Sequence, residues 1–184
     1  MRVRFITSNE GKYVEVREAL EGAGHELIWK KHPYPEVQTA SLDEVVEEGL
    51  AWLGQRLPGD EPFIIEDSGL FVPELRDFPG VFSAYVYKTI GNAGMLKLME
   101  GRSSRAARFE SRIGFWSREK GRHIFGGTCR GTISPSARGS SGFGYDPIFM
   151  PEGESRTFAE MVKTEKNAHS HRGRAAARFI RFLG

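Results

Sequence analysis

The sequence predicts a mixed α/β domain, and three observations support this. Short apolar runs with strand character alternate with helical patterns over the first part of the chain. Two long strand-like runs, residues 106–116 and 123–133, then follow one another and are expected to pair antiparallel. The chain has 184 residues, enough to bury one core, so we expect a single domain over residues 1–184. This order of elements is typical of a mixed sheet rather than a purely parallel one.

The first half of the chain contains two expected strand and helix pairs. Residues 2–7 predict a strand, and the apolar spacing of residues 14–20 predicts the helix that follows it. Residues 26–29 predict a second short strand. Ser41 and Glu44 have capping-box spacing ahead of an apolar helical pattern, which predicts the start of a second helix.

The middle and end of the chain add a buried strand and two more helices. Residues 63–65 form a compact apolar run that predicts a buried strand, and we expect that strand to end at Glu66 and Asp67. Residues 93–99 predict a helix. Ser170 can cap the last helix.

The composition indicates the cellular compartment of the protein and argues against some classes of binding partner. The single cysteine, Cys129, cannot form an internal disulfide, and no segment is apolar for long enough to span a bilayer. We therefore expect a soluble, cytoplasmic protein with no membrane partner. With 26 basic and 24 acidic residues the net charge is +2, too small to indicate a nucleic-acid-binding protein by itself.

The first segment whose residues could take part in binding or catalysis follows the first expected strand. It consists of Thr7, Ser8, Asn9, Glu10, Gly11 and Lys12. Hydroxyl, amide and backbone donors at the positive end of a helix favour a phosphate group. The spacing is not that of a P-loop. The alternative is an ordinary helix cap with a solvated lysine.

The second segment is a set of three carboxylates, Glu36, Glu66 and Asp67. Carboxylates that leave coordination sites open for water and phosphate oxygens suit Mg²⁺. The alternative is a solvated acidic surface, but Glu66 and Asp67 directly follow the buried apolar run, where charged residues generally have a role.

The third and fourth segments are glycine-rich and basic, respectively. The third consists of Ser141, Gly142, Phe143, Gly144, Tyr145, Asp146 and Pro147. It could be a platform for a flat ring or a glycine-rich turn anchored in the core. The fourth contains Lys166, Asn167, His169, Ser170, His171, Arg172 and Arg174. It could be an anion site at a helix start, a solvated basic face or a nucleic-acid groove.

Together the four segments supply the groups needed for nucleotide hydrolysis, and they resemble the inosine triphosphate pyrophosphatase (Ham1-like) family. The resemblance extends over nearly the whole chain. It is carried by residues 7–12, residues 66–70 with residues 79–84, residues 142–149, and residues 158–161 with residues 165–175.

The resemblance implies an elongated α/β fold, a mixed sheet with flanking helices that forms two lobes around a central nucleotide-binding cleft. It also implies a homodimer and a Mg²⁺ cofactor. It implies hydrolysis of ITP, dITP and XTP to the monophosphate and pyrophosphate, which cleanses the nucleotide pool. A modified pyrimidine triphosphate remains an alternative substrate.

Residue roles follow from the same resemblance. Residues 7–12 would hold the triphosphate, Glu36 and Asp67 would bind magnesium, and Asp67 would also be the general base. The remaining substrate contacts would come from Ser68, from the base platform Phe143, Gly144, Tyr145 and Asp146, and from Lys166, His171 and Arg172. Glu66 stands where the family more often has aspartate, so it is left out of the expected metal ligands.

Overall fold

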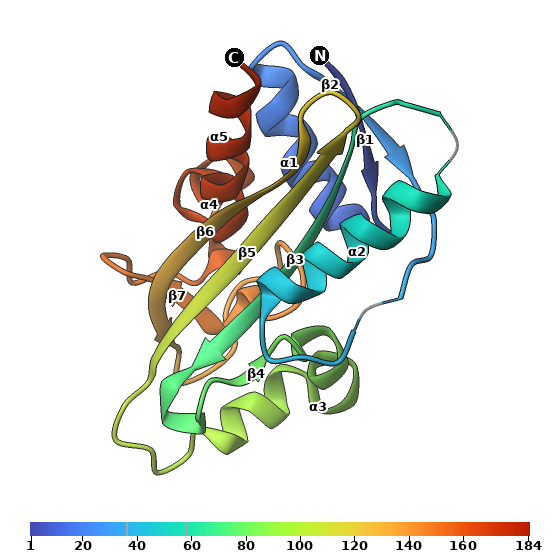
Figure 1. Cartoon of the computed structure of the whole chain (residues 1–184). Helices are drawn as coiled ribbons and strands as arrows, with labels where there is room; N and C mark the ends of the chain where they lie inside the picture. Colours follow the sequence, from blue (N-terminus) through green and yellow to red (C-terminus); the bar gives the residue numbers. More distant parts are fainter. Residues whose placement is uncertain (36, 58) are drawn as a thin grey trace.

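The computed structural model describes residues 1–35, 37–57 and 59–184, and it confirms the expected mixed α/β fold. The described residues form a seven-stranded sheet with the order β2-β1-β3-β5-β6-β7, and β4 pairs with β3. The strands are β1 (Arg2–Ile6), β2 (Glu26–Lys30), β3 (Phe63–Val72), β4 (Phe78–Gly80), β5 (Ala106–Ser117), β6 (Gly121–Ile133) and β7 (Phe149–Pro151). The helices are α1 (Glu10–Gly22), α2 (Leu42–Arg56), α3 (Ser83–Leu98), α4 (Lys163–His169) and α5 (His171–Leu183). The molecule is elongated along β5 and β6 (Figure 1).

The first lobe is a three-layer sandwich around the parallel strands β1, β2 and β3. On one face, Ile64 of β3 packs in a buried cluster with Val16 of α1 and Phe179 of α5. On the other face, Ile65 packs with Leu50 of α2. Successive side chains of a strand point to opposite faces of the sheet, so β3 serves both cores with adjacent residues.

β3 is longer than expected, and the prediction that it ends at Glu66 and Asp67 is wrong. The strand runs through both residues to Val72 because it pairs antiparallel with β5 over most of its length. Backbone hydrogen bonds sustain this ladder whatever the polarity of the side chains. Its parallel neighbour β1 pairs with it only at Phe63 and Ile64. The two carboxylates therefore lie in the middle of β3, just past the point where β1 leaves it.

The second lobe is formed by α3, β4 and the segments around β7. Its core contains Met95 of α3 together with Phe149 and Phe158. Helix α3 begins at Ser83, well before the expected residues 93–99. Gly91 has a non-helical backbone (φ 60°, ψ −163°) that divides the helix, so the helical pattern in the sequence is interrupted before residue 93.

The antiparallel pair β5 and β6 is confirmed, and α5 packs directly on it. The expected Ser170 cap is also confirmed, since its Oγ accepts a hydrogen bond from Gly173 N at 2.9 Å. Gly127 on β6 allows the close approach of α5, because a Cβ there would lie 2.1 Å from the His171 carbonyl oxygen. The start of α5 is thereby held beside the carboxylates of β3. In the part of the chain that is described, no helix is long and apolar enough to cross a membrane.

Candidate active site

A cavity of about 820 Å³ lies between the two lobes and brings the four sequence segments together. Its lining includes Thr7, Ser8, Asn9, Lys12, Glu66, Asp67, Ser68, Phe143, Gly144, Tyr145, Asp146, His171 and Arg172. The second lobe contributes Val81, Ser83 and Tyr87. The cavity is large enough for a nucleotide-sized ligand.

One end of the cavity is the turn between β1 and α1. Asn9 caps the helix, with its Oδ1 accepting from Lys12 N at 3.1 Å, and Thr7 Oγ1 accepts from Asn9 N at 3.1 Å. The Trp29 indole donates to the Thr7 carbonyl at 2.8 Å and fixes the turn from behind. The first backbone N–H groups of a helix carry partial positive charge, so this end favours an anion.

Three expected substrate contacts, Glu10, Gly11 and Lys166, are outside the described lining of the cavity, and Lys166 is buried. Glu10 is exposed on the first turn of α1. Gly11 contributes indirectly, because a Cβ at this position would lie 2.6 Å from the ring of Phe143. The glycine thus allows the aromatic platform to lie against the helix start.

The two carboxylates of β3 differ in their surroundings. Glu66 is buried, and Lys12 Nζ lies 3.0 Å from its Oε2, while Arg172 Nε and Ser111 Oγ donate to its Oε1 at 3.1 and 2.6 Å. Burial raises the pKa of Glu66, but the charges of Arg172 and Lys12 outweigh it and lower the pKa to about 2. Glu66 is therefore an ionised member of the network rather than an open metal ligand.

Asp67 is more accessible, with a side chain that is 19% exposed and lies 3.6 Å from Lys12 Nζ. Glu36, the other expected magnesium ligand, lies outside the described residues. Among the residues that are described, no three His, Cys, Asp or Glu side chains are grouped to hold a metal. Asp67 with phosphate oxygens and water still meets the needs of Mg²⁺, which commonly takes only one or two protein carboxylates.

Phe143 and its loop form the adjoining wall of the cavity, next to the start of α1. Phe143 N donates to Asp146 Oδ2 at 2.8 Å, and Gly142 has a φ of +78°, where a Cβ would lie 2.1 Å from the same oxygen. Cationic groups flank the ring, with Lys166 Nζ 4.9 Å and Arg172 Cζ 5.5 Å from its centroid. Tyr145 is mostly a core residue, and its hydroxyl donates to the Ser83 carbonyl at 3.1 Å.

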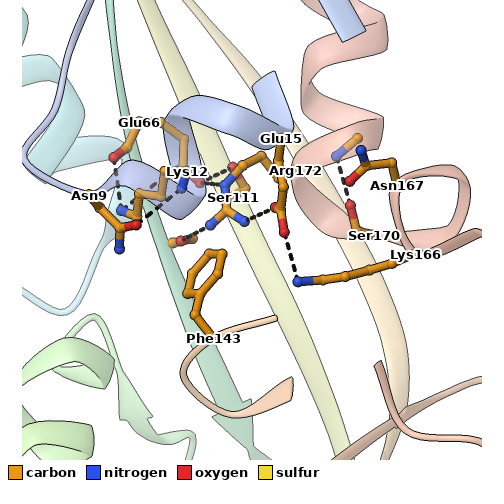
Figure 2. A network of polar contacts seen from close by, with 12 residues as sticks. Asn9, Lys12, Glu15, Glu66, Ser111, Phe143, Lys166, Asn167, Ser170 and Arg172 are labelled. Carbon is orange, nitrogen blue, oxygen red and sulfur yellow. Dashed lines mark hydrogen bonds and ion pairs between the residues drawn. The ribbon is translucent and has the colours of Figure 1, made fainter. Parts of the chain in front are cut away.

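Buried ion pairs connect the two cations that flank the aromatic ring to the rest of the site (Figure 2). Glu15 of α1 accepts from Lys166 Nζ at 2.7 Å and from Arg172 Nη1 at 2.5 Å. Lys166 also contacts Asp146 at 2.5 Å, and Arg172 Nη2 donates to Ser68 Oγ at 2.8 Å. Burial raises the pKa of Glu15, but Arg172 and Lys166 together lower it below its usual value. Each buried cation therefore has a carboxylate partner.

Glu15 and Ser111 are two residues that sequence reasoning missed. A signal for Glu15 was present, because it follows Lys12 by three positions in an expected helix and so lies on the same face. Ser111 gave no such signal. It faces Glu66 only because the β3–β5 ladder pairs Ser111 with Ser68.

His171 lines the cavity as a neutral side chain. Its ring stacks on Phe109 with centroids 4.6 Å apart and an interplanar angle of 11°. Burial, together with the charge of Arg172, lowers its pKa well below 6.5. Within the described chain its Nδ1 is buried and has no hydrogen-bond partner, so a ligand in the cavity can form a hydrogen bond with it.

A cleft that joins a cationic helix start and an accessible carboxylate to an aromatic platform defines a nucleotide-binding protein of the α/β class. The chain belongs to the Ham1 family, whose profile matches residues 3–182. The resemblance inferred from the sequence motifs is thus confirmed.

Three relatives indicate how far the similarity extends. The chain is 54% identical to a dITP/XTP pyrophosphatase of Thermococcus kodakarensis, over 100% of this chain and 97% of the relative. It is 53% identical, with the same coverage, to a dITP/XTP pyrophosphatase of Pyrococcus horikoshii. The solved structure of a HAM1 protein from Coxiella burnetii matches with a TM-score of 0.82 and 29% identity, over 100% of this chain and 98% of that one.

Proposed function

We propose that this protein hydrolyses the non-standard purine nucleoside triphosphates ITP, dITP and XTP to the monophosphate and pyrophosphate, and so cleanses the nucleotide pool. One observation supports this above all: Lys12, Asp67, Phe143 and Arg172 line one and the same cavity. These are the groups required for a phosphate chain and for a purine ring. The names of the two archaeal relatives described above, both dITP/XTP pyrophosphatases, agree with this assignment.

Asp67 is the proposed general base. It takes a proton from a water molecule whose oxygen attacks the α-phosphorus, and the bond from that phosphorus to the bridging oxygen breaks to release pyrophosphate. Lys12 and the start of α1 neutralise the charge that develops on the leaving group. Asp67 and Glu36 are the proposed magnesium ligands, and bound Mg²⁺ would stabilise the charge on the phosphate oxygens.

Base selection is assigned to the buried end of the cavity. The purine ring stacks on Phe143, and N–H donors of Lys166 or Arg172 bind the 6-oxo group of hypoxanthine or xanthine. The 6-amino group of adenine would leave a buried donor unpaired, and such mismatches can cost factors of ~10⁴ in specificity. ATP is therefore a poor substrate in this scheme.

The active form is a proposed homodimer in the cytoplasm. An apolar surface on and before α3 supports the dimer, because Phe82, Tyr85 and Ile90 are 47%, 70% and 42% exposed. Tyr85→Asp should convert the dimer to a monomer in light scattering, whereas Val162→Asp, at an exposed residue far along the chain, should not. A dimer that survives Tyr85→Asp would exclude this surface.

Product analysis tests the proposed reaction. The purified protein is incubated with ITP, dITP, XTP, GTP, ATP and a panel of modified pyrimidine triphosphates, with Mg²⁺ and then with excess chelator. We expect monophosphate and pyrophosphate from the first three substrates, little product from ATP, and loss of activity with chelator. Release of orthophosphate, equal rates with ATP and ITP, or a preference for pyrimidines would contradict the proposal.

A further inference from the structure

The basic residues near the end of the chain divide between two sites. His171 and Arg172 line the active-site cavity, but Arg174 and Arg178 of the same helix line a second cavity of about 520 Å³. Arg130 of β6 adds a third arginine to its lining, which also includes His169 of α4. The residues that line the cavity come from β6, α4 and α5 and from the end of β7. The proposed reaction leaves this second basic cluster unused.

The charge of the second cavity is unbalanced. Glu152 is its one acidic lining residue among the described residues, against the three arginines. Over the described ranges of the chain, none of these arginines forms an ion pair. This contrasts with the active site, where Lys166 and Arg172 are both paired with carboxylates.

Two of the arginines are already oriented. Arg174 Nη1 donates to the Thr128 carbonyl at 2.7 Å, and Arg178 Nη1 donates to the Gly126 carbonyl at 2.8 Å. A guanidinium has five N–H donors, so each of these bonds leaves the larger part of the group available. Fixed guanidinium groups lose little freedom on binding a phosphate, whose oxygens match their fork geometry.

Protection of a sheet edge explains only part of this arrangement. β7 pairs with β6 only at residues 131–133, so the stretch around Gly126 and Thr128 is an edge that charged side chains can cover. Arg130 and His169 do not serve this purpose. In the part of the molecule that is described, their side chains form no hydrogen bond, although both line the same cavity.

We propose that this second cavity binds a compact phosphate anion such as inorganic pyrophosphate. An extended nucleic acid fits less well, because the cations gather around one cavity and the whole chain has a net charge of only +2. The site is separate from the active-site cavity and does not depend on the proposed reaction.

The test is an amide NMR titration of the full chain with sodium pyrophosphate in the presence of chelator. We expect the amide chemical shifts of residues 126–130 to change with pyrophosphate concentration and to saturate. The dissociation constant from these residues should differ from that obtained for residues 7–12. The double variant Arg130→Gln and Arg178→Gln should weaken binding at residues 126–130 by about tenfold or more, because two charge-assisted contacts are lost. Binding at residues 7–12 should not change.

The matched control is the double variant Arg122→Gln and Arg181→Gln, which removes the same charge from the same strand and helix at exposed positions outside the cavity. It should bind pyrophosphate like the parent. If the first double variant does not fold, Arg130→Gln alone is used, since the Arg130 side chain holds no structural hydrogen bond. Absent shifts at residues 126–130, equal weakening in both double variants, or tighter and more salt-dependent binding of an oligonucleotide there would overturn the proposal.

Discussion

Two adjoining parts of the active site hold their charged groups in different ways. The proposed phosphate end contains Lys12 and Asp67, and the proposed base end contains Phe143, Lys166 and Arg172. At the phosphate end, Lys12 and Asp67 have side chains that are 17% and 19% exposed, so their charges can reach a ligand. At the base end, Lys166 and Arg172 are only 5% and 3% exposed and are held by buried carboxylates. A cation neutralised in this way still offers N–H donors in fixed directions. The difference agrees with the proposal that the phosphate end binds charge, whereas the base end recognises the purine through hydrogen bonds.

The largest effect is expected from Asp67→Asn, which changes the phosphate end alone. The substitution keeps the shape of the side chain but removes the proton acceptor and the charge of a proposed magnesium ligand, so kcat at saturating Mg²⁺ should fall about 10²- to 10⁴-fold. Steady-state release of pyrophosphate from ITP measures this. Asp77→Asn, at an exposed acid paired with Arg108, is the control and should keep normal activity. Near-normal turnover by a folded Asp67→Asn protein would exclude this general base.

The next largest effect is expected from Arg172→Met, which breaks the base end. The change leaves Glu15 and Glu66 buried without their arginine, and removing one partner of a buried pair costs about 3–5 kcal/mol in the free energy of unfolding. Urea unfolding measures this. Arg181→Met, exposed on the same helix, should change the free energy by no more than about 0.5 kcal/mol. Equal effects of the two variants would mean that the buried network does not stabilise the fold.

The same contrast separates what the sequence could predict from what it could not. The phosphate end follows from local rules, because Asn9 and Lys12 lie in one strand–helix turn whose cap is readable from the residues. The order of elements and the β5–β6 pair were also predictable from periodicity.

The base end depends on contacts between residues far apart in the chain. Glu15 meets Lys166 and Arg172 only after α5 has packed on the sheet, and no local pattern encodes that meeting. The position of Glu66 was misjudged for a related reason. An apolar run marks where a strand is buried, but the ladder with β5 decides where the strand ends.

A smaller effect is expected from Phe143→Leu, which removes the ring but keeps bulk against Gly11. Stacking of a base on an aromatic ring contributes about 1–3 kcal/mol, so KM for ITP should rise roughly tenfold. Inhibition by inorganic tripolyphosphate, which has no base, should be unchanged and serves as the internal control. A parallel loss of affinity for tripolyphosphate would show that Phe143 supports the phosphate end instead.

The smallest effect concerns the neutral His171 at the base end and appears as a pH dependence. Its folded pKa lies well below the unfolded value of 6.5, so between these two values the unfolded chain binds more protons than the folded one. Stability should therefore fall as the pH drops below 6.5, by up to about 1.4 kcal/mol per pH unit from this residue. His171→Gln should flatten the slope of the free energy of unfolding in this range, which urea unfolding at a series of pH values measures. An unaltered slope in His171→Gln would mean that protonation of this imidazole does not lower the free energy of unfolding. The base end could then carry a positive charge on His171 and would resemble the phosphate end.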